Sequence, residues 1–203
     1  MNSFLEISEK KRDRLLNAVI EVFAAVPFEK ASLREVAKQA DISKTLLFYY
    51  FQDKKTIYIK TFEYCSEIIA NEIKSRQSIK NETDFFEIIT FTQDIKFGLV
   101  SRYPKIFDFL KNAYDETDNE IKQKIYDIRR KYLNEDLVSV FSKADFSKFK
   151  DDISSETALS IITWVAEGFV ASHNGTCDID VLRKEFDKYL IVLKNSFYKE
   201  KFL

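Results

Sequence analysis

Apolar residues recur at three- and four-residue spacings along most of the chain, which is the period of an amphipathic α-helix. The first such stripe predicts a helix over roughly residues 8–26. It ends before Pro27, because proline cannot donate a backbone N–H or continue a helix. Ser32 precedes Glu35 by three residues, a capping-box arrangement that predicts the start of a short second helix. After a break in the pattern, Ser43 can cap a third short helix.

The third helix has one apolar and one polar face. Its predicted inward residues are Ile42, Leu47 and Phe51, and its predicted outward residues are Ser43, Lys44, Thr45 and Tyr49. Two short helices joined by a tight turn, after a longer supporting helix, make a helix-turn-helix, and the major groove of DNA is wide enough to admit its second helix. Lysine can reach a phosphate or a guanine edge, and a tyrosine hydroxyl suits a phosphate contact. In a plainer interpretation, the aromatic residues 48–51 only pack a small core.

Beyond residue 53 the pattern predicts a second, larger helical region. Its helices are expected over residues 54–78, 83–101, 104–114, 119–141, 155–173 and about 181–197, with a loop over residues 142–151. Pro104 is placed in the first turn of its helix, where its missing N–H does no harm. Asn174 or Gly175 can end the preceding long helix in the left-handed conformation. We therefore predict an all-α protein of about nine helices.

Composition supports this fold class. The 203 residues include three glycines and two prolines, too few for the many turns of a sheet protein of this size. The net charge is −1, but residues 1–60 hold 11 basic and 8 acidic residues, so this part can meet a polyanion, although such an excess is also ordinary scatter. No apolar run approaches the ~18 residues of a membrane span. We expect a cytoplasmic protein without a membrane partner.

Catalytic chemistry has little support in the sequence. The single histidine, His173, lies at a predicted helix end. Cys65 and Cys177 are too far apart in the sequence to suggest a metal-binding pair, and three scattered glycines cannot form a phosphate-binding loop. We expect no enzymatic activity, no metal and no cofactor.

Residues 10–65 resemble the DNA-binding domain of the TetR family of transcriptional regulators. The stretch ASLREVAKQA at residues 31–40 resembles the family's second helix, and SKTLLFYYFQDK at residues 43–54 resembles its turn, recognition helix and entry into the fourth helix. Three positions depart from the family pattern: Asp41 replaces glycine, Thr45 a small residue and Tyr50 a common histidine. Aspartate tolerates the left-handed conformation better than most residues, so we expect the turn at Asp41 to be kept.

The resemblance implies DNA contacts at the matching positions. At the start of the second helix these are Ser32 and Arg34. The leading edge of the recognition helix would be formed by Ser43, Lys44, Thr45 and Leu46. Phosphates would be held by Tyr49, Tyr50 and Lys54.

The resemblance also divides the chain into a helix-turn-helix domain at residues 1–53 and an effector-binding and dimerisation domain at residues 54–203. In the family the last two helices form a four-helix dimer interface. Candidate interface residues are Ile161, Val165, Gly168, Phe186, Leu190 and Leu193. An apolar or aromatic effector would lie between the helices of this domain. Its candidate contacts are Phe91, Phe107, Tyr114, Trp164 and Glu167, although aromatic residues in helical domains more often pack the core.

These expectations combine into one function. We predict a ligand-responsive regulator that binds a palindromic operator in double-stranded DNA as a homodimer and is released by a small-molecule effector. Repression is implied by the commoner habit of the resembled family. The alternative is a helical protein-interaction module without sequence-specific DNA binding.

Overall fold

The computed structural model describes residues 8–79, 82–134, 141–172 and 179–203, and its regular structure within these residues is helical. The α-helices are α2 (Glu9–Ala25), α3 (Leu33–Ala40), α4 (Lys44–Phe51), α5 (Lys54–Ile79), α6 (Phe85–Arg102), α7 (Ile106–Tyr114), α8 (Asn119–Arg129), α10 (Ser155–Ser172) and α11 (Ile179–Phe197). Short 3₁₀ turns cover Phe28–Lys30, Phe146–Lys148 and Glu200–Phe202, and a π turn covers Arg130–Asn134. The predicted all-α fold is confirmed.

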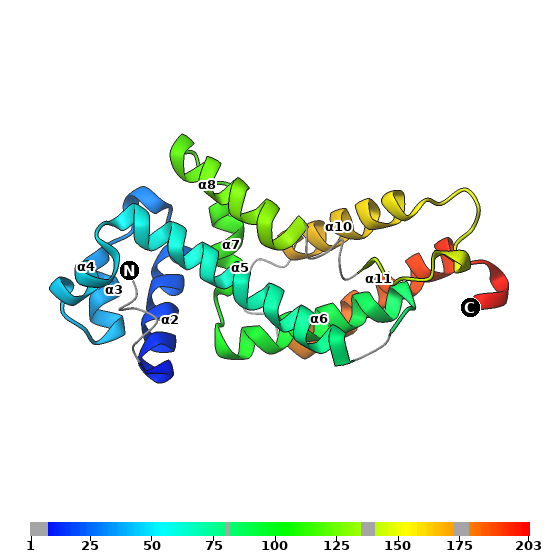
Figure 1. Cartoon of the computed structure of the whole chain (residues 1–203), viewed down its shortest axis with the longest axis horizontal. Helices are drawn as coiled ribbons and strands as arrows, with labels where there is room; N and C mark the ends of the chain where they lie inside the picture. Colours follow the sequence, from blue (N-terminus) through cyan, green and yellow to red (C-terminus); the bar gives the residue numbers. More distant parts are fainter. Residues whose placement is uncertain (1–7, 80–81, 135–140, 173–178) are drawn as a thin grey trace.

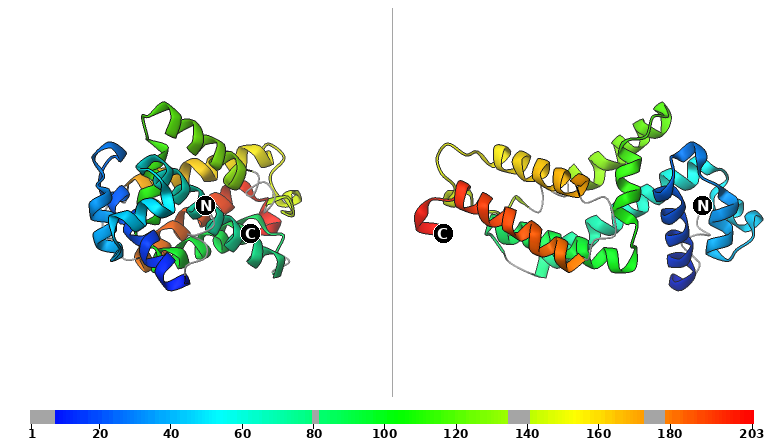
Figure 2. Two further views of the ribbon diagram at one scale, coloured as in Figure 1. Left: turned by 60° about the vertical axis from the view of Figure 1, so that its left-hand side comes forward. Right: turned by 180° about the vertical axis from the view of Figure 1, so that it is seen from behind.

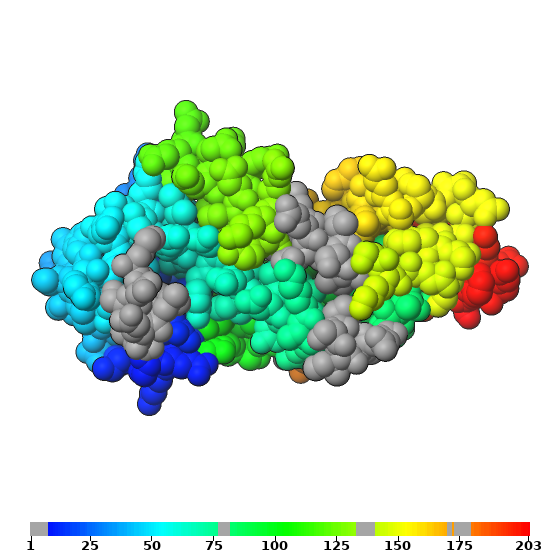
Figure 3. Space-filling view, viewed as in Figure 1, coloured from blue at the N-terminus to red at the C-terminus, as the bar shows by residue number. Residues whose placement is uncertain are grey.

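The molecule is elongated, with α2, α3 and α4 gathered at one end (Figure 1). The long helix α5 runs from this end into the rest of the chain, where it lies beside α6. Seen from behind, α10 and α11 lie on the side away from α3 and α4 (Figure 2). The space-filling view places the C-terminal residues at the opposite extremity from the N-terminal helices (Figure 3). None of the described helices is long and apolar enough to cross a lipid bilayer.

Side-chain caps start several helices where the sequence predicted them. The Ser32 hydroxyl accepts from the Glu35 N–H at 3.4 Å, and the Ser43 hydroxyl accepts from the Leu46 N–H at 3.0 Å. The Glu35 carboxylate accepts from the Gln39 side chain at 3.3 Å, so it points along the helix, away from its first turn. The observed interactions at α3 therefore correspond to one half of the expected capping box.

Three predicted boundaries differ from the structure. Pro104 lies in a turn two residues before α7, because the chain bends after α6 before the new helix begins at Ile106. The segment expected as one helix over residues 119–141 is α-helical to Arg129 and continues as a π turn to Asn134, while residues 135–140 fall outside the described residues. The expected loop over residues 142–151 contains a 3₁₀ turn and the start of an antiparallel bridge to Tyr198. The predicted helix stop at residues 173–175 falls outside the described residues.

Helix α2 holds the N-terminal helices against the rest of the molecule. It packs on α3 within its own end of the chain and on α7 and α5 of the larger part. At this junction Tyr58 of α5 meets Phe23 of α2 edge-on at 4.9 Å and Phe109 of α7 at 5.3 Å between ring centroids. Buried aromatic pairs of this geometry contribute about 0.5–1.5 kcal/mol each beyond their area. The N-terminal helices are therefore packed against α5 and α7 through a buried aromatic cluster.

Candidate nucleic-acid interface

The turn between α3 and α4 is a tight left-handed helix cap. Asp41 has φ 55° and ψ 49°, and its N–H donates to the Lys38 carbonyl at 3.1 Å. The Ile42 N–H donates to the Ala37 carbonyl at 3.0 Å, which completes a Schellman arrangement. The prediction that aspartate keeps this turn is confirmed. Arg14 of α2 also pairs with the Asp41 carboxylate at 3.2 Å, on the exposed side of the turn.

Helix α4 separates its two faces as predicted. Leu47 is fully buried and Phe51 is 6% exposed, so both anchor the helix to the core. Ser43, Lys44, Thr45 and Tyr49 are exposed. The exposed fraction of Tyr49 is 71%, so this aromatic side chain does not pack in the core. The first turn of α4 has no acidic residue, so the positive end of its dipole is left for an anion such as DNA phosphate.

The aromatic residues of α4 do not form a single packed core. Phe51 is buried, and Tyr50 is half-buried with its ring edge-on to Phe51 at 6.4 Å. Phe48 is 36% exposed and lies under the Lys44 ammonium, 5.6 Å from it. Tyr49 contacts the Tyr50 ring at 5.8 Å but otherwise faces outward. The plainer interpretation of these residues as core packing therefore holds for Phe51 and, in part, for Tyr50.

Ser32 and Arg34, at the start of α3, are both exposed. Lys54 has a different environment from the one expected. Its ammonium donates to the Glu29 carbonyl at 2.9 Å and lies 4.9 Å from the centre of the Phe28 ring. Burial lowers the pKa of this ammonium. In this structure Lys54 therefore stabilises the turn at Phe28–Lys30. The sequence does not reveal this contact, because its partner is a backbone carbonyl 25 residues away.

A polar cluster joins α2 to the end of α6, and we call it the α2–α6 clamp. It consists of Glu9 and Asp13 on α2 with Arg102 and Tyr103 at the end of α6. The Arg102 guanidinium lies 2.6 Å from both acidic side chains, and the Tyr103 hydroxyl donates to Asp13 at 2.7 Å. Burial and the Asp13 carboxylate raise the pKa of the Tyr103 phenol, so its proton stays in this hydrogen bond.

Further polar contacts lie around the same junction. The Asn112 amide of α7 donates to the Ala24 carbonyl at the end of α2, at 2.8 Å. The Lys55 ammonium of α5 lies 2.6 Å from Glu120, in the first turn of α8. The partners in these contacts and in the clamp lie 65 to 93 residues apart, so no local pattern could reveal them. The larger part of the chain therefore holds α2 by side chains as well as by packing.

Of the five candidate effector contacts, Tyr114 and Glu167 lie close together, because both contact Arg129. The Arg129 guanidinium lies 4.7 Å from the centre of the Tyr114 ring and 3.5 Å from the Glu167 carboxylate. Phe91 and Phe107 are half-buried on α6 and α7. Trp164 lies on the outside of α10 with 68% of its surface exposed, because the opposite face of that helix is the one buried at Ala158 and Ile162. It does not line the interior of the chain.

The candidate dimer residues fall into two groups, which are buried in their own chain or at least partly exposed. Phe186 and Leu190 are buried at 3% and 5% exposure within their own chain, so they are corrected to core positions. Gly168 is exposed, whereas Ile161, Val165 and Leu193 are partly buried. The exposed apolar residues of α10 and α11 are instead Trp164, Val181, Tyr189, Ile191 and Val192. The candidate residues come from both faces of α10 and α11, because apolar periodicity alone does not separate the inner face of a helix from its outer face.

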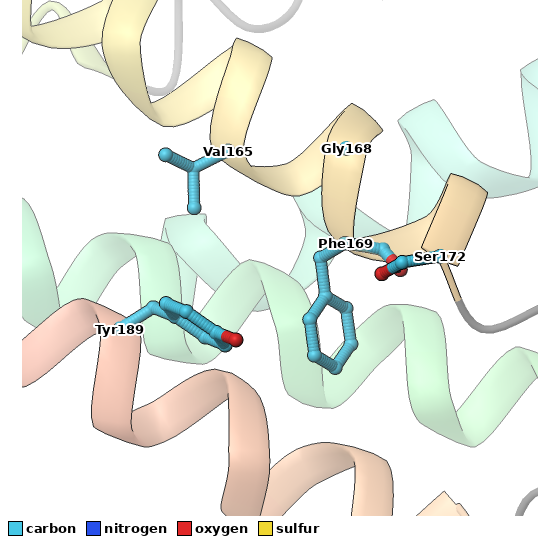
Figure 4. A pocket seen from close by; sticks show the side chains of 5 residues that line it. All are labelled: Val165, Gly168, Phe169, Ser172 and Tyr189. Carbon is cyan, nitrogen blue, oxygen red and sulfur yellow. The ribbon is translucent and has the colours of Figure 1, made fainter.

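A hollow of about 210 Å³ lies between α10 and α11 (Figure 4). It is lined by Val165, Gly168, Phe169, Ser172 and Tyr189. The Phe169 ring meets the Tyr189 ring edge-on at 5.9 Å, so an aromatic pair forms part of the wall. Within the described residues, no three side chains of the metal-ligating kinds gather into a possible metal site.

Comparisons with known proteins agree with this geometry. Residues 15–60 match the model of the bacterial regulatory proteins of the tetR family. The biofilm operon icaADBC HTH-type negative transcriptional regulator IcaR of Staphylococcus aureus is 22% identical over 189 residues, which are 93% of this chain and all of that protein.

Solved structures with the same fold include the transcriptional regulator FadR of Bacillus subtilis in complex with stearoyl-CoA. Its TM-score is 0.70 at 20% identity, over 89% of this chain and 96% of that one. The ketosteroid transcriptional regulator KstR2 of Mycobacterium tuberculosis has a TM-score of 0.71 at 13% identity, over 96% and 98% of the two chains. The likeness therefore extends well beyond the helix-turn-helix.

A helix-turn-helix with an exposed polar edge, carried on a larger helical body, defines the class of DNA-binding transcriptional regulators. Residues 15–60 form a DNA-binding domain of the tetR family of bacterial regulatory proteins, and the chain as a whole has the fold of a TetR family transcriptional regulator.

Proposed function

We propose that this protein is a ligand-responsive repressor that binds a palindromic operator as a homodimer. The observation that carries the proposal is the division of α4, whose inner face is buried at Leu47 and Phe51 while its outer edge is exposed from Ser43 to Thr45 and at Tyr49. Repression is supported by the Staphylococcus aureus relative, which is a negative transcriptional regulator. The proposed operator-binding domain is residues 1–53, and the proposed effector and dimerisation domain is residues 54–203.

The proposed DNA contacts follow from the chemistry of the exposed edge. Lys44 and Thr45 lie at the start of α4, the end that enters the major groove in helix-turn-helix proteins, and both side chains can reach base edges there. Ser32, Arg34, Ser43, Leu46, Tyr49, Tyr50 and Lys54 complete the proposed contact set. Lys54 would have to leave the Glu29 carbonyl to reach a phosphate, whereas Tyr49 needs no rearrangement.

Dimerisation is proposed through the exposed apolar face of α10 and α11. One helix-turn-helix makes few phosphate contacts and binds weakly. Two copies held by a twofold interface read half-sites one helical turn apart, about 34–36 Å along the duplex. Val192 and Ile191 expose 62% and 61% of their surface, and Trp164 lies on the neighbouring helix at 68%. A second copy of this face would cover these side chains and remove their apolar surface from water.

Effector control is proposed to act through the junction with α2. An effector releases the operator only if it binds the DNA-free conformation more tightly than the DNA-bound one. The α2–α6 clamp and the Asn112 contact connect the proposed effector domain directly to α2, which carries α3 on its other side. FadR of Bacillus subtilis, which has the same fold, binds stearoyl-CoA, and this supports an effector with a large apolar part.

The test is footprinting and gel-shift binding on DNA upstream of the protein's own gene, at 50 and 200 mM salt. We expect protection of two half-sites centred 10–10.5 base pairs apart, or a multiple of that spacing, and affinity that falls steeply with salt. Binding that is absent, or equal on unrelated DNA of the same length, would contradict the proposal. It would favour the alternative of a helical protein-interaction module.

A further inference from the structure

Lys96 occupies an unusual position in the middle of α6. Residues at positions 85, 89, 92, 96, 99 and 103 follow one face of the helix, and this face is buried. The other members are Phe85, Ile89, Thr92, Leu99 and Tyr103, each at 7% exposure or less. Lys96 therefore lies among buried neighbours one turn before and one turn after it, and not at a helix end where its stem could reach water easily.

Other partly buried lysines of this protein have polar partners. Lys148 pairs with Asp84 at 2.8 Å, Lys55 with Glu120 at 2.6 Å, and Lys150 donates to the Ser196 carbonyl at 2.8 Å. Lys96 has no hydrogen-bond or ion-pair partner among the described residues. A partly buried ammonium without a counter-charge is destabilising, and burial lowers the pKa of Lys96 accordingly.

Part of the Lys96 side chain nevertheless stays accessible, although both neighbours in its stripe, Thr92 and Leu99, are sealed from solvent. Solvent therefore reaches the Lys96 side chain at this point of the buried face. Its neighbours on α6 are the apolar residues Leu99 and Val100 and the polar residues Gln93 and Thr92, and the Thr92 hydroxyl already donates to the Ile89 carbonyl at 2.8 Å. A molecule that reaches Lys96 therefore meets a positive charge on a largely apolar helix face.

We propose that Lys96 anchors the anionic group, a carboxylate or a phosphate, of an effector whose remaining part is apolar. The inference rests on the proposed effector-responsive function and narrows its ligand class. A charge-assisted hydrogen bond from the ammonium would supply the missing counter-charge, and the apolar part would lie along the buried face of α6.

The position also connects the ligand to the DNA-binding helices. Lys96 lies six residues before Arg102, which is about 9 Å along the axis of one rigid helix. Arg102 is the residue that holds Asp13 and Glu9 in the α2–α6 clamp. An anion bound at Lys96 therefore acts on the same helix that positions α2.

The first test needs no ligand and compares thermal unfolding of the delipidated wild-type chain with Lys96→Met and Lys122→Met. Lys122 is an exposed lysine of α8 and serves as the matched control. Removal of an uncompensated ammonium should raise the melting temperature in Lys96→Met and leave Lys122→Met unchanged. A lower melting temperature in Lys96→Met would show that the ammonium is already paired, and would overturn the proposal.

The second test measures ligand binding by equilibrium dialysis. The anionic probes are decanoate, 2-naphthoate and decyl phosphate, and their neutral counterparts are methyl decanoate, methyl 2-naphthoate and decanol. We expect at least one anion to bind the wild-type chain about tenfold or more tightly than its neutral counterpart. Lys96→Met should lose this preference, and Lys122→Met should keep it. Carboxylate and phosphate sources are distinguished by which probe shows the preference.

The proposal is overturned if no anion is preferred, or if Lys96→Met prefers anions as the wild type does. Gel-shift binding without ligand is measured on the wild type and on the control Lys122→Met and should be equal for the two. A wild-type chain that binds no DNA contradicts the proposed function. The dialysis experiment tests the ligand site at Lys96 independently of that result.

Discussion

Tyr49 and Leu47 lie two residues apart on α4, yet one is 71% exposed and the other fully buried. The helical repeat places them on different faces, and this division is what makes α4 suitable as a reading helix. Thr45 lies one turn before Tyr49 on the same exposed side. The two side chains differ in the contact that each can make, because a tyrosine hydroxyl suits a phosphate whereas threonine at the leading edge can reach a base.

Replacement of these residues should therefore have different effects. We expect Tyr49→Phe to weaken binding by a similar factor on all operator variants, because a phosphate contact carries no sequence information. Thr45→Ala should change the preferred base at one position of each half-site, with a difference of about 1–3 kcal/mol between bases. Quantitative gel shifts on a set of single-base operator variants measure both. Equal effects from the two substitutions would contradict the placement of the leading edge.

The Asp84 carboxylate makes two stabilising interactions, a helix cap and an ion pair. It caps α6 by accepting from the Phe86 and Glu87 N–H groups, and it pairs with Lys148 at 2.8 Å. Burial alone would raise its pKa, but the hydrogen bond from Lys148 and the cap lower the pKa below the usual value of 3.8. The charged form is therefore the one that the folded state favours.

The pH dependence follows from the sign of this shift. Because the folded pKa is depressed, the contribution of Asp84 is present above the unfolded pKa of about 3.9 and is lost as the pH falls through the lower folded value. We expect Asp84→Ala to lower the free energy of unfolding by about 2–3 kcal/mol at pH 7, from the lost cap and the lost charged hydrogen bond. Asp84→Asn keeps a capping oxygen and should lose less. Urea unfolding at pH 7 and pH 3 measures both variants, whose difference from wild type should shrink at pH 3.

At the scale of elements, α2 has the central place. It supports α3 on one side and meets α5 and α7 on the other. Its acidic residues Glu9 and Asp13 both contact Arg102, but Asp13 is the more buried of the two, with 24% of its side chain exposed against 68% for Glu9. Only Asp13 also accepts from the buried Tyr103 hydroxyl. The attachment of α2 to α6 should therefore depend on one acid more than on the other.

We expect Asp13→Asn to lower the free energy of unfolding by about 1–3 kcal/mol, since it removes a charged acceptor shared by Arg102 and Tyr103. Glu9→Gln is the matched control within the same clamp, and an exposed pair of this kind contributes about 0–1 kcal/mol. Urea unfolding of the two variants provides the measurement. A larger loss in Glu9→Gln than in Asp13→Asn would show that the clamp is organised around the outer acid.

At the scale of the whole molecule, the helix-turn-helix and the exposed face of α10 and α11 lie at different places on an elongated body (Figure 1). A monomer would leave Val192, Ile191 and Trp164 largely in water. Large exposed apolar patches are typical of protein–protein contacts, and we propose that these side chains belong to one. The proposed dimer would use this face to set the separation of its two reading helices.

Val192→Glu tests this arrangement, because a carboxylate at the centre of the interface would be buried without a partner. We expect light scattering after size exclusion to give a mass near the 23.9 kDa of one chain, where the wild type gives twice that value. Operator affinity should fall about 100-fold or more through loss of the second half-site. Lys122→Glu, an exposed charge reversal on α8, should remain dimeric. A wild-type chain that is monomeric at micromolar concentration would contradict the proposed interface.

The sequence predicted most of the local features of the proposed DNA interface. The caps at Ser32 and Ser43, the left-handed turn at Asp41 and the two faces of α4 all follow from interactions between residues three to five apart. Such interactions depend on the order of residues and little else, so a single chain contains them in readable form. The same holds for the all-α class, since the helical period is a local property.

The tertiary structure alone decided which apolar faces turn inward. The sequence cannot distinguish Phe186, which is buried, from Val192, which is 62% exposed, because both are apolar residues on one helix and only the packing of α11 against its neighbours separates them. Tertiary packing also decides the environments of three basic residues, Lys54, Arg102 and Lys96. Their contacts, or the lack of them, depend on groups that are distant in the chain and meet only after folding.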